Sequence, residues 1–172
     1  MNGDGYSEIA VGDPLFNGNR GRVRLIDGKS RRANVTDLVA PTNFTGRFGS
    51  SIASLGDMSG DGIPDIAVGA PTYGAGTGPK GAVFVYVGVQ GGTGAFGVTG
   101  LSGNQINGGG GSLVGSKSNE QYGTSLAFLG RFFDQYIGQG TLAIGAPKGG
   151  SAATGGRVEF VTFHIDPISG VV

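Results

Sequence analysis

Residues 57–71 read DMSGDGIPDIAVGAP and combine the clearest structural signals of the chain. An acidic loop, residues 57–65, leads into a short apolar run at residues 66–68, and the run ends at a Gly-Ala-Pro turn. A short continuous apolar run is typical of a β-strand that is buried on both faces. This stretch therefore predicts a polar loop followed directly by a buried strand.

The apolar run and its turn occur three times in the chain. The copies read IAVGDP, IAVGAP and LAIGAP, and they lie at residues 9–14, 66–71 and 142–147. A glycine that opens an alternating strand follows each copy, and an aromatic residue with a glycine precedes the second and third copies. These flanking residues are Gly21, Gly81 and Gly156, and the pairs Phe48-Gly49 and Tyr122-Gly123. A unit of four short strands that recurs along the chain in this way predicts the blades of a β-propeller.

The composition favours a β-protein with many tight turns. Glycine supplies 38 of the 172 residues, and each interior glycine costs a helix roughly 1 kcal/mol, which excludes a mainly helical protein. The formal net charge is zero and there is no cysteine, so nothing indicates nucleic acid as a partner, and disulfides and thiolate metal sites are excluded. No apolar run is long enough for direct membrane insertion. The fold class expected is all-β, a partial β-propeller of about 2.5–3 four-stranded blades.

The repeats divide the chain into three units within one repeat region, residues 1–172. Unit 1, residues 1–47, is a truncated blade, unit 2 covers residues 48–121, and unit 3 covers residues 122–172. Unit 2 has a glycine-rich outer segment, residues 88–115, which is either a ragged outer strand or a loop, with the loop favoured. Because Met1 aligns with Met58 inside the acidic loop, we expect Met1 to be an internal methionine of a longer polypeptide. Its end blades would then pack on neighbouring blades or self-associate.

The acidic loop carries the side chains with the clearest chemistry. Oxygen-bearing side chains occupy its positions 1, 3, 5 and 9, and glycine occupies position 6, an opening that calcium-binding loops use. We expect a calcium site with three carboxylates, a hydroxyl and one main-chain carbonyl. Its ligands are Asp57, Ser59, Asp61, Ile63 through its carbonyl oxygen, and Asp65. The alternative is a turn rich in aspartate that binds nothing.

Unit 1 contains a shortened second copy of this loop. Aligning the two loops places four residues of unit 1 on Ser59, Asp61, Ile63 and Asp65. These four residues are Asn2, Asp4, Tyr6 and Glu8. The position equivalent to Asp57 would precede Met1, so we expect only an incomplete second calcium site. Unit 3 contains no equivalent loop.

With these motifs, the chain resembles the FG-GAP repeats of integrin alpha subunits, and more closely the looser FG-GAP units of large secreted bacterial and protist proteins. The resemblance implies a seven-bladed β-propeller of the extracellular space or cell surface. It also implies calcium loops on one face and ligand-binding loops on the opposite face. Two departures are Gly12-Asp13-Pro14, where the family has Gly-Ala-Pro, and Tyr122, where it has Phe.

Three functions remain open from the sequence. The first is a non-enzymatic adhesion or binding module whose protein or glycan ligand contacts the loops at residues 15–20, 72–80 and 148–155. The second is a non-catalytic accessory propeller of a secreted hydrolase that cleaves polysaccharide or phospholipid. The third is a structural spacer in a giant surface protein. No catalytic residue is predicted, because the single histidine, His164, lies at a strand end and no nucleophile motif is present.

Overall fold

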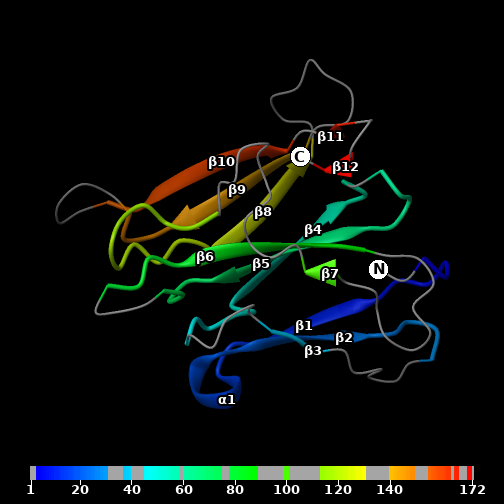
Figure 1. Cartoon of the computed structure of the whole chain (residues 1–172), viewed down its shortest axis with the longest axis horizontal. Helices are drawn as coiled ribbons and strands as arrows, with labels where there is room; N and C mark the ends of the chain where they lie inside the picture. Colours follow the sequence, from blue (N-terminus) through cyan, green and yellow to red (C-terminus); the bar gives the residue numbers. More distant parts are fainter. Residues whose placement is uncertain are drawn as a thin grey trace.

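The computed structural model describes residues 3–30, 37–39, 45–58, 60–74, 78–88, 99–100, 113–130, 140–149, 155–163, 165–166 and 170–171. Three antiparallel sheets lie one above another (Figure 1). The first contains β1 (Ile9–Asp13), β2 (Arg22–Ile26) and β3 (Asp37–Leu38), and the second contains β4 (Ser51–Gly56), β5 (Asp65–Ala70), β6 (Ala82–Val87) and β7 (Thr99–Gly100). The third contains β8 (Ser125–Gly130), β9 (Gly140–Ala146) and β10 (Arg157–Phe163), and a separate pair is formed by β11 (Ile165–Asp166) and β12 (Gly170–Val171). The fold is all-β, as predicted.

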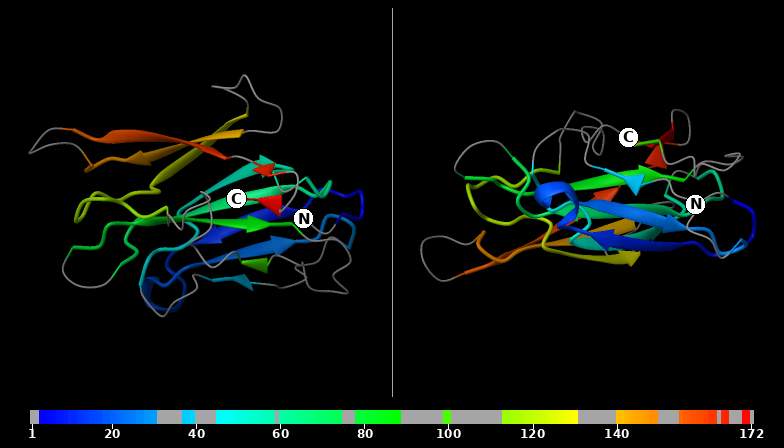
Figure 2. Two further views of the ribbon diagram at one scale, coloured as in Figure 1. Left: turned by 45° about the horizontal axis from the view of Figure 1, so that its top comes forward. Right: turned by 90° about the horizontal axis from the view of Figure 1, so that it is seen from below.

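A single short turn, α1 (Phe16–Asn19), is the one helical element of the described residues. It is irregular, because Asn17 and Gly18 have positive φ angles inside it. No helix among the described residues is long and apolar enough to cross a membrane. Figure 2 shows from two further directions that the sheets are layered and that α1 lies beside the first sheet.

The three copies of the apolar run form equivalent strands of the three sheets. These strands are β1, β5 and β9, and each pairs on one side with the strand that a glycine opens: β2, β6 and β10. On their other side, β5 pairs with β4, and β9 pairs with β8. Every residue of β5 is buried, which confirms the prediction that this run is a strand covered on both faces.

Successive side chains of a strand point to opposite faces of its sheet, and the apolar ones form two hydrophobic cores between the sheets. Ile66 and Val68 of β5 belong to the core shared with the first sheet, which also contains Val23, Leu25 and Phe48. The alternate residues of the second sheet belong to the core shared with the third sheet. That core includes Ala53, Leu55, Ala67, Val83, Val85, Tyr122, Leu142, Ile144 and Phe163. The middle sheet is therefore apolar on both faces because it is the only described sheet with neighbours on both sides.

The outer face of the third sheet exposes apolar side chains. Val158 and Phe160 of β10 are 60% and 50% exposed, whereas the equivalent residues of β6, Val83 and Val85, are 3% and 4% exposed. In the described part of the chain, the third sheet covers this face of the second sheet, whereas no sheet covers the same face of the third. This face is the one that a following blade would cover in a propeller.

The predicted outer segment of unit 2 lies mostly outside the described residues. Within it, Thr99 and Gly100 form β7 at the edge of the second sheet, and Val114 makes a β-bridge to Ala82. Those described residues pair with β6 as a ragged outer strand would. Among the described strands, the first and third sheets have three members each, compared with the four that the sequence predicts for a blade.

Candidate functional site

The acidic loop between β4 and β5 is closed by its own aspartates. Asp57 Oδ1 accepts hydrogen bonds from the N–H groups of Gly60 at 2.7 Å and Asp61 at 3.1 Å, and its Oδ2 accepts from Gly62 N–H at 2.8 Å. Asp61 Oδ1 accepts from Ile63 N–H at 2.9 Å. Gly60 and Gly62 have φ angles of 81° and 86°, a region that favours glycine. The first aspartate therefore acts as the centre around which the loop backbone winds.

Asp65 has a different role in the described structure. Its side chain is buried, with Oδ2 accepting from Met58 N–H at 2.8 Å and Oδ1 accepting from Gly88 N–H at 2.8 Å. It thereby joins the start of the acidic loop to the end of β6. These two hydrogen bonds replace part of the hydration that the buried carboxylate loses on folding.

The shortened loop of unit 1 repeats part of this geometry. Asp4 Oδ1 accepts from Tyr6 N–H at 3.0 Å, which matches the bond between Asp61 and Ile63. Gly3 and Gly5 have φ angles of 72° and 85°, close to those of Gly60 and Gly62. The two loops therefore follow the same backbone turn over the part that both possess.

The strand ends next to the two loops also correspond. A Cβ atom on Gly28 would lie 2.0 Å from Ser7 O, and one on Gly88 would lie 2.7 Å from Pro64 O. Ser7 and Pro64 occupy the same place in the two loops. Each glycine thus lets the end of its strand approach the backbone of the neighbouring loop.

The carboxylates of the predicted calcium site do not converge in the described structure. Among the described residues, no three acidic or imidazole side chains form a group able to hold a metal ion. Asp57 and Asp61 lie in the exposed part of the loop, while Asp65 is turned into the protein. Ser59 and Asn2 lie outside the described residues, so the predicted ligand set is only partly placed. By chemistry, the carboxylates and the Ile63 carbonyl are donors that suit calcium.

A set of ion pairs that the sequence did not reveal lies on the faces of the first and third sheets. Arg22 pairs with Asp13 at 3.1 Å and Asp37 at 2.9 Å, and Arg24 pairs with Asp37 at 3.1 Å. Hydrogen bonds from Arg24 and then Arg22 lower the pKa of Asp37 below its usual value. The charges of Arg22 and Arg24 are therefore balanced by aspartates on adjacent strands.

The equivalent arginine of unit 3, Arg157, lies between the second and third sheets. It donates to Glu120 Oε1 at 3.0 Å and also pairs with Glu159, and Glu120 is completely buried. The bond to Glu120 raises the pKa of Arg157 above its usual value. Glu120 Oε1 also accepts from Ser116 N–H at 2.6 Å. This pair fixes the segment before Tyr122 to β10.

Paired glycines form the seams between the sheets. A Cβ atom on Gly12 would lie 2.1 Å from Gly49 O, and one on Gly69 would lie 2.1 Å from Gly123 O. Parallel bridges join Gly21 to Phe48 and Gly81 to Tyr122 beside these contacts. Each aromatic–glycine pair that opens a unit therefore rests on two glycines of the unit before it. The repeat motif is thus a contact motif between sheets.

A family model for the FG-GAP repeat matches residues 48–86. Residues 48–86 are therefore similar to an FG-GAP repeat. The matched residues begin at the Phe48-Gly49 pair that forms the first seam, and they end on β6. They include the acidic loop and the Gly-Ala-Pro turn.

Several known proteins match about half of this chain. Integrin alpha-5 of Xenopus laevis is 39% identical over 101 residues, which cover 54% of this chain and 9% of the integrin. Integrin alpha-IIb of Mus musculus is 41% identical over 99 residues, covering 51% and 9%. Phosphatidylinositol-glycan-specific phospholipase D of Mus musculus is 38% identical over 102 residues, covering 52% and 12%. The chain therefore spans about a tenth of the length of these relatives.

The loops predicted to contact a ligand leave the opposite ends of the strands from the acidic loop. The acidic loop enters β5 at Asp65, and the turn at residues 71–74 leaves β5 at Ala70. In the first sheet, β1 follows the shortened acidic loop and ends near α1 (Figure 1). Residues 75–77 and 150–154 of the predicted ligand loops lie outside the described residues, as does His164.

Proposed function

We propose that the chain is a calcium-binding part of an extracellular or cell-surface FG-GAP propeller that presents a ligand-binding surface for adhesion. The single observation that carries this proposal is the acidic loop of the FG-GAP repeat, whose turn recurs between Asp4 and Tyr6. A turn kept in two units of different sequence supports a role for the loop beyond closing one hairpin. The similarity to integrin alpha chains supports the cell-surface setting.

Calcium would be held by the loop that Asp57 opens. Asp57 and Asp61 would supply exposed carboxylates, the Ile63 carbonyl and Ser59 hydroxyl would add neutral oxygens, and Asp65 would anchor the far end. When bound, calcium supplies a cross-link between the two arms of the loop. Asp57 now accepts three N–H groups of the loop, so binding includes a rearrangement of this aspartate's contacts. The shortened loop with Asn2, Asp4, Tyr6 and Glu8 is proposed as a weaker site.

The ligand surface is assigned to the end of the sheets opposite the acidic loops. It comprises the segments at residues 15–20, 72–80 and 148–155, which are rich in glycine and small polar residues. The partner is proposed to be a protein or a glycan. The surface is non-catalytic in this proposal. A second candidate, an accessory propeller of a secreted hydrolase, is favoured by the match to a phospholipase D.

Titration calorimetry of the whole chain with calcium tests the proposal. We expect saturable binding with a dissociation constant of about 10⁻⁴–10⁻³ M, the range of extracellular calcium modules. Asp61→Ala should abolish the main binding event, whereas Asp37→Asn, an aspartate outside both loops, should leave it unchanged. Equal calcium uptake by the Asp61→Ala variant and the unmodified chain would refute the assignment.

A further inference from the structure

Four exposed cations lie at the end of the sheets opposite the acidic loops. Arg47 lies in the segment before β4, Lys80 directly before β6, Lys117 in the segment before β8, and Lys148 in the turn after β9. Figure 1 shows the turns after β5 and β9 at one end of the sheets and the start of β5, where the acidic loop enters, at the other. We call these four residues the cationic surface.

Main-chain hydrogen bonds join the segments that carry these cations. Thr72 N–H donates to Gly46 O at 3.2 Å, which connects the turn after β5 to the segment before β4. Tyr122 N–H donates to Lys80 O at 3.0 Å, and a bond of 3.1 Å connects Lys148 N–H to the segment before β8. The cations are therefore carried by one continuous hydrogen-bonded backbone, which limits the ordering that binding would require.

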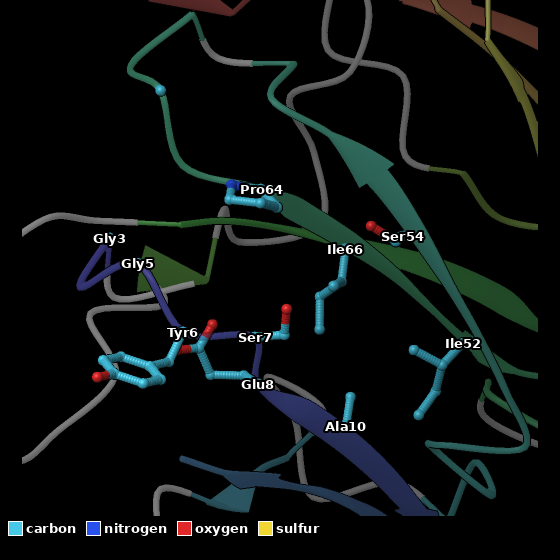
Figure 3. Close-up of a pocket in the computed structure, with 11 residues that line it drawn as sticks. Gly3, Gly5, Tyr6, Ser7, Glu8, Ala10, Ile52, Ser54, Pro64 and Ile66 are labelled. Carbon is cyan, nitrogen blue, oxygen red and sulfur yellow. The ribbon is translucent and has the colours of Figure 1, made fainter. Parts of the chain in front are cut away.

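The cationic surface has a net positive charge, although the chain as a whole is neutral. The acids described at this end pair with arginines: Asp13 and Asp37 with Arg22, and Glu120 and Glu159 with Arg157. In the described part of the chain, no ion pair joins a residue of the cationic surface to an acid. Figure 3 shows the opposite end, with Glu8 in the shortened loop of unit 1 and Pro64 in the acidic loop of unit 2.

The exposed neighbours of the cations are small and polar. They are Ser50, Ser116, Ser118, Asn119 and Thr124. Among the described residues, the segments at 45–50, 78–80, 115–124 and 147–149 expose no large hydrophobic side chain. Interfaces between proteins are instead enriched in aromatic residues and depleted in lysine. The surface therefore suits a partner that is bound through ion pairs and hydrogen bonds alone.

We propose that the cationic surface binds an anionic polysaccharide. The inference rests on the proposed ligand surface, which contains Lys80 and Lys148, and it narrows the partner from a protein or glycan to an anionic glycan. Ammonium and guanidinium groups would pair with sulfate or carboxylate groups, and the hydroxyl and amide side chains would bond to the sugar hydroxyls.

The geometry of the repeat suits an extended ligand. Sheets stacked face to face lie about 10 Å apart, so cations carried by successive sheets are spaced along the direction in which the sheets stack. A polysaccharide with regularly placed anionic groups can follow that direction across the ends of the sheets. Blades of a propeller pack through their sheet faces, so this end would stay accessible in a larger propeller.

The repeat itself supplies substitutions that suit the fold. Gln121 occupies the place of Arg47 in unit 3, and the two residues have similar φ angles of 60° and 52°. Thr72 occupies the place of Lys148 in unit 2. The variants are therefore Arg47→Gln, Lys80→Gln and Lys148→Thr, each measured singly and all three combined. Circular dichroism should show unchanged thermal unfolding for each single variant.

A heparin octasaccharide with a fluorescent label is the probe, and fluorescence anisotropy with the whole chain in EDTA buffer is the measurement. We expect saturable binding that weakens steeply between about 0.05 M and about 0.5 M salt, because salt screens exposed charges. The combined variant should bind about tenfold more weakly or worse. Lys29→Gln, which changes an exposed lysine beside Tyr6 at the opposite end, should change affinity less than about twofold. A neutral dextran oligosaccharide should not bind.

Three results would overturn the proposal. They are no saturable binding of the octasaccharide at low salt, an equal loss of affinity in the Lys29→Gln control and the combined variant, and equally tight binding of a polyglutamate peptide. The last result would indicate an acidic protein as the partner. Calcium titration of the combined variant should match that of the unmodified chain. A failure to bind the octasaccharide with calcium binding intact would thus overturn this inference and leave the proposed calcium site standing.

Discussion

A methyl group placed in the seam between the second and third sheets should destabilise the protein strongly. In the Gly69→Ala variant, the new Cβ would lie 2.1 Å from both Gly123 O and Ser51 Oγ. The φ angle of Gly69 is not among the positive ones, so alanine would not be strained by its own backbone conformation. The cost therefore comes from the contact between the sheets.

The magnitude follows from these contacts. A separation of 2.1 Å is about 1 Å shorter than atoms of this kind tolerate, and the backbone carbonyl of Gly123 cannot rotate away as a side chain can. Overpacking of a tight contact costs typically 1–3 kcal/mol. The hydrogen bond from Ser51 Oγ to Gly123 O, 2.7 Å long, would be disturbed as well, which adds about 1 kcal/mol. We expect a loss of about 2–4 kcal/mol and a fall in Tm of roughly 5–15 °C for a chain of this size.

The third unit provides a matched control. A Cβ on Gly145, the equivalent glycine, would approach only Ser125 closely, with Ser125 Oγ at 2.2 Å and the next atom at 3.5 Å. A serine hydroxyl on an exposed residue can rotate away, so Gly145→Ala should cost less than about 1 kcal/mol. Urea and thermal unfolding followed by circular dichroism measure both variants. Equal destabilisation by the two substitutions would refute the view that Gly69 is required by the seam.

Three other predictions concern charge and the open face. Glu120→Gln should lower the free energy of unfolding by about 2 kcal/mol in urea unfolding, less than for a fully buried pair because Arg157 is partly exposed; no loss would contradict the role given to the pair. The pKa of Asp37 is lowered in the folded state. The charged Asp37 therefore stabilises the fold above its unfolded pKa, and this stabilisation is lost as the pH falls through its folded-state pKa. Asp37→Asn should therefore flatten the decline of stability below about pH 4, and an unchanged acid unfolding curve would argue against it. Replacing Val158 and Phe160 together by serine should reduce self-association in sedimentation equilibrium, and an unaltered concentration dependence would contradict the expectation that the exposed outer face of the third sheet self-associates.

Much of the fold was predictable because the same local sequence pattern recurs in three units, so each unit supports the interpretation of the others. The apolar run at residues 66–68 predicted the buried strand β5, and the alternation after Gly81 predicted β6 with its two faces. A strand that is buried on both faces needs a sheet on each side of its own sheet. The three copies of the apolar run in one chain provide these neighbouring sheets. The sequence therefore indicated stacked blades before any contact was known.

The seams could not be predicted, because they depend on contacts between distant units. The approach of Gly12 to Gly49 joins residues that no local pattern connects, although both glycines recur at fixed places. The buried pair of Glu120 and Arg157 is equally non-local.

The acidic loop was predicted in position, but its hydrogen bonding was not. The spacing of Asp57, Asp61 and Asp65 predicted a tight loop with three acids, and the structure places that loop between β4 and β5. The spacing could not indicate that Asp65 faces inward toward Met58 and Gly88. Whether an aspartate caps backbone N–H groups or faces solvent is decided by the chain packed around it. Calcium binding by this loop stays a prediction.

A crystal structure of the whole chain grown with calcium, with anomalous diffraction used to locate the ion, would show whether the acidic loop binds calcium. The proposal predicts an anomalous peak in the loop between β4 and β5, bound by the carboxylates of Asp57 and Asp61 and by the Ile63 carbonyl oxygen. A loop that keeps Asp57 on the N–H groups of Gly60, Asp61 and Gly62 and shows no peak at millimolar calcium would contradict it.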